Sequence, residues 1–187
     1  MVTMFGLAIL FVIVGGIGYF IGIYNDLVRL HHNIDKSWAN IDVLLKQRRD
    51  ELPKLVETCK AYMKYEQNLL EQITQCRANY MKATSVNDKT QTENEISKLL
   101  KNVFAVAENY PDLKANQNFL QLQGRISGLE NAIADRREFF NESVNVYNIK
   151  IQQFPQVLVA NMVGYQARHL LQIPEAETKD VELGFTR

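Results

Sequence analysis

The fold of this chain is decided by the stretch WANIDVLLKQRRDELPKLVETCKAY, residues 38–62. Alternating steps of three and four residues from Trp38 meet an apolar or aromatic side chain at nearly every position. The stripe runs through Ile41, Leu45, Arg48, Leu52, Leu55, Cys59, Tyr62, Glu66, Leu69, Ile73, Cys76 and Tyr80. Because this spacing places the side chains on one helix face, it predicts long helices that share a core. No glycine occurs between Ile23 and Gln123, which is typical of long helices.

Pro53 interrupts this stripe and leaves two interpretations open. Proline inside a helix removes a hydrogen bond and costs about 3 kcal/mol. The unbroken stripe favours one kinked helix, whereas Pro53 with Asp50 as a cap favours two helices that fold back as a hairpin. We favour the hairpin because it gives helices of more nearly matched length.

Two further helices follow a polar connection. Thr92 and Glu95 form a capping box that predicts the start of the first helix, which ends near Tyr110. The second is predicted to run from its N-cap, Asn116, to about Phe154. Its apolar face reads Phe119, Leu122, Ile126, Leu129, Ile133, Arg136, Phe140, Val144, Tyr147 and Ile151. We therefore predict an all-α fold, in which a single N-terminal transmembrane helix is followed by an elongated antiparallel, up-and-down bundle of about four helices.

No charged side chain occurs in the N-terminal run FGLAILFVIVGGIGYFIGI, residues 5–23. At about 1.5 Å per residue, a helix of this length spans roughly 28 Å, close to the hydrocarbon thickness of a bilayer. No Lys or Arg precedes the run, and no small-residue cleavage site follows it. We therefore predict a retained, single-pass anchor rather than a signal peptide.

The charges around this span predict its orientation. Lysine and arginine side chains follow the span and none precedes it, so the positive-inside rule places the soluble part in the cytoplasm and the anchor in the inner (cytoplasmic) membrane. We divide the chain into the anchor, residues 1–24, the helical bundle, residues 25–165, and a polar, poorly ordered C-terminal tail, residues 166–187.

Composition and motifs argue against an enzyme or a nucleic-acid-binding protein. The 21 basic and 21 acidic side chains leave no positive surplus for phosphate backbones, so we expect no nucleic-acid partner. His31 and His32 stand near Asp35, but a third metal ligand is missing, which favours polar residues at the membrane interface. Cys59 and Cys76 lack redox or ligand spacing and are interpreted as reduced, partly buried thiols. We predict no catalytic residue, no metal and no cofactor.

Arg48 and Arg136 fall on the apolar stripes of two different helices, and each is followed by a second arginine. One hypothesis is an anion or phosphate site between the helices, because guanidinium groups match phosphate oxygens. The other is a buried ion-pair layer that fixes the register of the helices. We favour the ion-pair layer because carboxylates are equally abundant around both arginines.

Small residues follow one face of the predicted anchor. Gly15, Gly18 and Gly22 recur at spacings of three and four, and the last two form a GxxxG motif. Five of the nine glycines in the chain lie in the anchor, which favours a packing role. We predict a homo-oligomer assembled at least partly through this face.

A short apolar patch, QVLVANMVGY, follows Pro155 and is too short to cross a membrane. It either lies in the membrane interface or covers the open end of the bundle core. We favour covering, with inward-facing side chains at Phe154, Val157, Leu158, Val159, Met162 and Val163.

Three long stretches resemble the bacterial LemA family: the opening stretch, FAVAENYPDLKANQNFLQLQ at residues 104–123, and ENAIADRREFFNESVNVYNIKIQQFP at residues 130–155. The resemblance covers nearly the whole chain. It implies a membrane-anchored helical bundle whose biochemical activity is not established, and it supplies no catalytic residue. Through gene context, it also implies membrane proteases or other envelope proteins as partners.

Together, these observations predict a membrane-anchored, non-enzymatic scaffold or adaptor of the bacterial envelope that self-associates and recruits other membrane proteins. Two alternatives stay open. One is an anion- or ligand-sensing module that uses the arginine pairs, and the other is a protein that binds the lipid surface.

Overall fold

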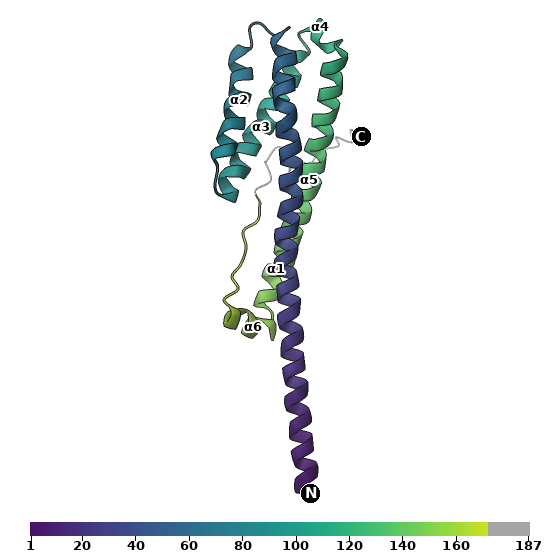
Figure 1. The fold of residues 1–187 in the computed structure, drawn as a ribbon, viewed down its shortest axis with the longest axis vertical. Coiled ribbons are helices and arrows are strands. Elements are labelled where there is room, and N and C mark those ends of the chain that lie inside the picture. Colours follow the sequence, from purple (N-terminus) through teal and green to yellow (C-terminus); the bar gives the residue numbers. More distant parts are fainter. Residues whose placement is uncertain (172–187) are drawn as a thin grey trace, which may run out of the picture. The chain divides into compact units, whose positions relative to one another are not determined.

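The structure, a computed structural model, describes residues 1–171. Within that range the regular structure is helical throughout, which confirms the predicted all-α fold (Figure 1). The helices are α1 (Val2–Lys60), α2 (Gln67–Lys82), α3 (Val86–Ala107), α4 (Pro111–Lys114), α5 (Gln117–Gln152) and α6 (Gln156–Val163). The predicted tail, residues 166–187, lies mostly outside the described residues.

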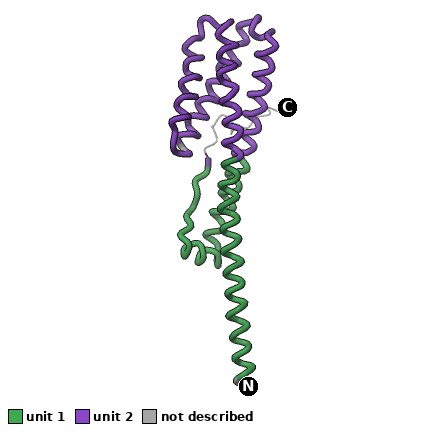
Figure 2. Tube along the Cα trace, in the orientation of Figure 1, with its two compact units in different colours: residues 1–39, 138–170 green, residues 40–137, 171–187 purple. Residues whose placement is uncertain are grey.

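These helices form two compact units (Figure 2). Unit 1 comprises residues 1–39 and 138–170, and unit 2 comprises residues 40–137 together with Leu171. The first part of α1, the last part of α5 and all of α6 therefore belong to unit 1. The rest of α1 and α5 joins α2, α3 and α4 in unit 2.

Pro53 lies inside α1 and does not end it, so the favoured hairpin at this position was wrong. The ring of Pro53 is exposed, whereas Leu52 and Leu55 on the opposite side are buried. Fully burying one leucine side chain contributes about 1.5–3 kcal/mol, so the continuous apolar stripe outweighs the cost of one proline, about 3 kcal/mol. The chain reverses only after Lys60, where the stripe reaches its last buried α1 residue, Cys59.

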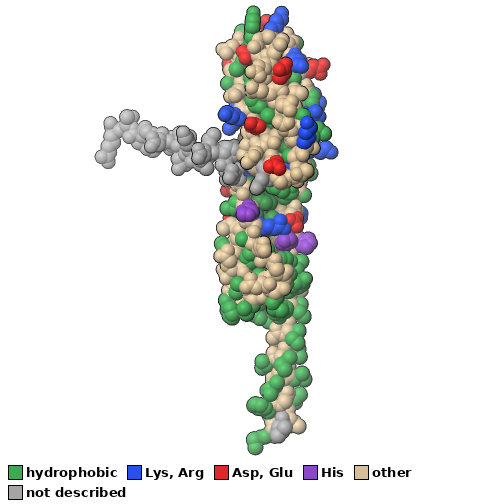
Figure 3. All heavy atoms as spheres, turned by 90° about the vertical axis from the view of Figure 1, so that its left-hand side faces the viewer, with side chains coloured by type: hydrophobic (Ala, Val, Ile, Leu, Met, Phe, Trp, Pro, Cys, Tyr) green, Lys and Arg blue, Asp and Glu red, His purple; other side chains and the backbone are tan. Residues whose placement is uncertain are grey.

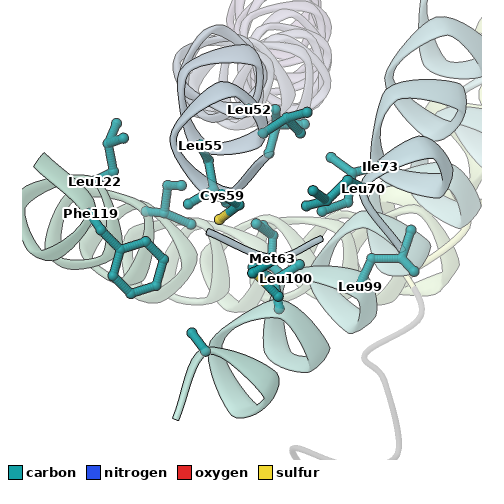
Figure 4. Packing of buried hydrophobic residues seen from close by; sticks show 14 of the residues in the cluster. Leu52, Leu55, Cys59, Met63, Leu70, Ile73, Leu99, Leu100, Phe119 and Leu122 are labelled. Carbon is teal, nitrogen blue, oxygen red and sulfur yellow. The ribbon is translucent and has the colours of Figure 1, made fainter. Parts of the chain in front are cut away.

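Unit 2 is an up-and-down arrangement of four long helical segments around one core (Figure 1). Figure 4 shows side chains from these segments pointing toward one another. The core residues labelled in Figure 4 are Leu52, Leu55, Cys59, Met63, Leu70, Ile73, Leu99, Leu100, Phe119 and Leu122. Each of the four segments contributes apolar side chains at helical spacing, and the burial of these side chains against one another holds unit 2 together.

Polar side chains cap the N-termini of α3 and α5, and the sequence predicted one of these two caps. Ser85 accepts a hydrogen bond from the backbone N–H of Asp88 at 3.0 Å and caps α3. Thr92, the predicted cap, lies within α3 and donates to the Asp88 carbonyl at 2.9 Å. Asn116 is confirmed as the N-cap of α5, because its side-chain oxygen accepts from the Phe119 N–H at 3.1 Å.

In unit 1, the end of α5 and all of α6 pack with α1. The packed part of α1 begins at Ile23, the first buried residue among those described. Lys150 Nζ lies 3.5 Å from the Asp26 carboxylate, and Trp38 meets Phe140 edge to face with ring centroids 6.1 Å apart. The described residues before Ile23 are exposed on all sides. This exposed part supplies the one helix in the described range that is long and apolar enough to cross a membrane.

The apolar patch at α6 divides between inside and outside. Val159 and Ala160 are buried, but Phe154, Leu158 and Met162 are exposed. The prediction that all of its large side chains cover the core was therefore wrong. An eight-residue helix presents only one face to its neighbours, and the opposite face of α6 is apolar as well.

Candidate functional site

The most tightly packed polar group in unit 2 is the guanidinium of Arg48, which has no exposed surface. It donates to the carboxylates of Glu93 from α3 and Glu130 from α5. Ser97 Oγ accepts from Arg48 Nη1 at 2.7 Å and donates to Glu130 at 2.8 Å. Three helices of unit 2 therefore meet at one charged centre, which we call the Arg48 cluster.

Arg49 extends this cluster toward α2. Its Nη1 lies 3.3 Å from the Glu93 carboxylate, and its guanidinium carbon stands 3.5 Å from the centre of the Tyr80 ring. The Tyr80 hydroxyl donates to Asp42 at 2.9 Å. Burial and this hydrogen bond raise the pKa of Tyr80, so the hydroxyl stays protonated.

Charge is balanced across the Arg48 cluster, because two arginines face two glutamates. Both terminal nitrogens of Arg48 are already occupied by carboxylates, and solvent does not reach them. An incoming anion would have to displace a carboxylate from a dry environment, which is costly. Arg48 is therefore held in internal ion pairs between three helices, as the ion-pair hypothesis expects of this residue.

Arg136 is exposed, and its neighbour Arg137 occupies the buried position instead. Arg137 donates to the side-chain oxygen of Asn94 at 2.9 Å. After Ile133, the next buried residues of the stripe are Arg137, four residues later, and Phe140, three residues after that. The predicted stripe placed Arg136 in this position by a step of three and then four, and both orders fit the helical repeat.

His31 belongs to an aromatic cluster in unit 1. Its ring stacks on Tyr165 with centroids 5.0 Å apart and planes 5° apart, and it meets Tyr147 edge to face at 5.8 Å. Arg168 Nη2 donates to His31 Nε2 at 2.9 Å and lies 3.5 Å from Asp35. Burial and the Arg168 charge lower the pKa of His31, which favours the neutral ring that accepts this bond.

These contacts hold the chain that follows α6. Asn148 bonds both backbone groups of Arg168, at 2.9 and 2.8 Å, and the Tyr147 hydroxyl donates to the Gln166 carbonyl at 3.2 Å. Within residues 1–171, no group of three or more His, Cys, Asp or Glu side chains is arranged to hold a metal ion. The role of His31 in the described structure is therefore to bind this segment.

Cys59 and Cys76 are buried free thiols. Burial raises the pKa of Cys59 to about 12. Burial, together with the charge of Glu95 and a hydrogen bond to it, raises that of Cys76 to about 11. A thiol with such a pKa is protonated at neutral pH and is a poor nucleophile.

Gly15, Gly18 and Gly22 lie in the exposed part of α1. Open space surrounds each of them, because a Cβ built there meets no heavy atom within 4 Å apart from its own helix and chain neighbours. They remain available for contact with another helix.

Two open recesses in unit 2 were not predicted from the sequence. An apolar groove of about 250 Å³ is lined by Leu52, Pro53, Val56 and Ile73, with Glu57, Lys60, Thr74 and Arg77 at its rim. A cationic recess of about 290 Å³ is lined by Lys46, Arg49, Asp50, Arg77, Tyr80, Met81, Ala83 and Lys89. The periodicity of the sequence indicated which helix faces are buried, but it could not indicate where two packed helices leave a recess between them.

The fold and these clusters define a helical-bundle protein with a candidate membrane helix and with its most deeply buried charges held in internal pairs. The LemA family model matches residues 37–185, and the chain belongs to this family. Neither the family description nor the names of the relatives below denote an enzyme.

The chain is similar to named proteins of several bacteria. It is 29% identical to Protein LemA of Metamycoplasma hominis over 97% of this chain and 84% of that protein. It is 21% identical to Magnetosome protein MamQ 2 of Paramagnetospirillum magneticum, over 83% of this chain and 67% of the relative. Magnetosome protein MamQ of Magnetospirillum gryphiswaldense is 20% identical over 76% of this chain and 62% of its own length.

Because Arg48 is the centre of this cluster, we predict a large loss of stability when it is replaced. Arg48→Met leaves the fully buried Glu93 carboxylate with only Arg49 as a partner, and should lower the free energy of unfolding by about 3–5 kcal/mol. The measurement is urea unfolding of the full-length protein in detergent micelles, followed by circular dichroism.

Arg136→Met is the matched control. The same substitution at this exposed position should change the free energy of unfolding by no more than about 0.5 kcal/mol. Equal losses in the two variants would contradict the assignment of the buried charge to Arg48.

Proposed function

We propose that this protein is a membrane-anchored, non-enzymatic scaffold or adaptor of the bacterial envelope, which organises or recruits other membrane proteins. The observation that carries the proposal is the nature of α1, a single helix from Val2 to Lys60. Its first part is exposed and apolar, and its last part forms the core of a bundle whose central charges are paired internally. The chain thus joins a membrane helix to a folded domain in which only surfaces remain for binding.

The proposed location is the inner membrane, with the bundle in the cytoplasm. Basic side chains follow the candidate span and none precedes it, which favours this orientation. The resemblance to LemA proteins adds membrane proteases and other envelope proteins as the proposed partner classes. The balanced charge of the chain argues against a nucleic-acid partner.

The apolar groove is the proposed contact surface for a partner. Its floor consists of Leu52, Val56 and Ile73, and charged side chains stand at its rim. An apolar centre with a polar rim is the general layout of a protein–protein contact. Thr74 lies at the rim and is exposed, so a probe placed there reaches a bound partner without disturbing the core.

A photoreactive amino acid at position 74 should therefore capture a discrete partner in native membranes. The same residue in place of Lys101, an exposed position on α3, is the control and should capture little. Adducts are separated by electrophoresis and identified by mass spectrometry. Identical adduct patterns from the two positions, or no adduct from position 74, would contradict the scaffold proposal.

We also propose that the protein self-associates through the anchor. Gly18 and Gly22 are spaced as GxxxG, with Gly15 on the same side, and all three are exposed. Small residues at this spacing allow two membrane helices to approach closely, so that packing forces act between the backbones.

Gly18→Leu combined with Gly22→Leu should reduce the oligomer, because bulky side chains separate the helices. The bundle should stay folded, since a Cβ at either position meets no neighbouring side chain. The measurements are the mass in detergent and the crosslinking pattern in membranes, with Ile13→Leu as a conservative control in the same exposed segment. An oligomer of unchanged mass in the double variant would eliminate this interface.

A second candidate function, anion sensing, is favoured by the cationic recess. Lys46, Arg49, Arg77 and Lys89 line it against one carboxylate, Asp50. This local surplus of positive charge contrasts with the zero net charge of the chain. The recess is open to solvent, so phosphate oxygens could reach the lysine and arginine donors.

Inorganic pyrophosphate is the probe for this candidate. If it binds, a concentration of 100 times Kd should raise Tm by roughly 5–10 °C. Arg77→Gln with Lys89→Gln should remove the shift, whereas Lys98→Gln, exposed and outside the recess, should retain it. A shift that survives in the double variant, or no shift in the native protein, eliminates the anion-binding role.

A further inference from the structure

Large apolar side chains are exposed on α6 and in the turn that precedes it. Phe154 is 80% exposed, Leu158 56% and Met162 75%, and they recur every four residues. The opposite face packs inward through Val159 and Ala160. Leu158 and Met162 therefore form one side of a short, packed helix, and Phe154 adds a third exposed apolar side chain in the turn before it.

Charge is absent along this part of the chain. No Asp, Glu, Lys or Arg occurs between Lys150 and Arg168. An apolar helix face that contacts water ordinarily has charged residues among or beside its apolar ones. The composition of α6 and its flanks thus matches an environment less polar than water.

α6 belongs to the same unit as the candidate membrane span. The exposed run of α1 ends at Gly22, packing begins at Ile23, and Lys150 is paired with Asp26 one turn later. α6 begins only six residues after Lys150. The end of α5 is therefore fixed beside the point at which α1 leaves the bilayer, and α6 follows directly.

The views of unit 1 agree with this placement. Figure 1 shows α6 beside α1 at the end of the packed region from which the exposed part of α1 emerges. Figure 3 shows hydrophobic side chains gathered around the same level, next to the apolar run of α1. The exposed Tyr19 and Tyr24 bracket this level of α1, as expected of residues at a membrane interface.

We propose that α6 lies in the headgroup region of the bilayer that α1 crosses, with Phe154, Leu158 and Met162 inserted toward the acyl chains. Interfacial helices bury an apolar face at this depth, about 5–10 Å into the interface, and in α6 the inner face packs against unit 1 instead of facing water. The exposed apolar side chains of α6 belong to the same unit as the exposed apolar run of α1, which favours lipid rather than a protein as their occupant.

The small size of α6 does not oppose this role. A free eight-residue helix buries too little apolar surface to hold a soluble protein on a membrane. Here α1 already fixes unit 1 at the bilayer, so insertion of α6 is an intramolecular step with a high effective concentration. The inference concerns lipid contact alone and does not depend on the scaffold proposal.

The test measures the depth of nitroxide labels on the full-length protein in vesicles of phosphatidylethanolamine and phosphatidylglycerol. Leu158→Cys and Met162→Cys each receive a label. Phe139→Cys is the matched control, because Phe139 is 56% exposed on α5 in the same unit, roughly 20 Å of helix before Gln152. The native cysteines are buried thiols, so the unsubstituted protein should take up little label.

Collision of each label with oxygen, which concentrates in lipid, is compared with collision with a water-soluble nickel chelate. The ratio at positions 158 and 162 should exceed that at position 139 several-fold, with helicity unchanged by circular dichroism. A ratio equal to that at position 139 overturns the proposal, since it places α6 in water. Exclusion of both reagents together with spin–spin broadening overturns it as well, because a second copy of the chain then covers the helix.

Discussion

The buried guanidinium of Arg48 is the constraint on which the rest of unit 2 depends. A cation without access to water requires carboxylates at fixed places, and these come from Glu93 on α3 and Glu130 on α5. Apolar stripes alone allow helices to slide by a turn, because leucine packs against leucine in several registers. A charged centre favours one register, and alignment of three helices is the role we propose for the Arg48 cluster beside the apolar core.

The sequence predicted this centre in part, and the reason lies in the helical repeat. From Ile41 through Leu45 to Leu52 the alternation of three and four passes through position 48, so Arg48 could be placed on the buried face. After Ile133 two orders of steps were possible, and the observed one buries Arg137 rather than Arg136. The partners Glu93 and Glu130 could not be predicted, because a periodic pattern does not specify which helices face each other.

The fold was predictable where local chemistry decides it and uncertain where tertiary packing decides it. The Asn116 cap satisfies a backbone N–H of its own helix and is visible in the sequence. Pro53 is the opposite case, since its local preference for a break is overcome by the apolar residues that α1 buries on both sides of it. The same limit applies to the apolar groove and the cationic recess of unit 2, which exist only once the helices are packed.

The function of this protein is best sought on its surfaces, because the titratable side chains in its interior already serve the fold. The thiols of Cys59 and Cys76 are held protonated by raised pKa values, and the neutral His31 ring accepts a hydrogen bond from Arg168. Each group therefore stabilises the fold in the state that makes it least reactive. Large apolar side chains stay exposed in two places, the anchor and the outer side of α6, and the groove beside Pro53 adds an open recess. Such surfaces carry no chemistry of their own, but they lower their free energy by binding other helices or lipid, which is what the proposed scaffold role requires.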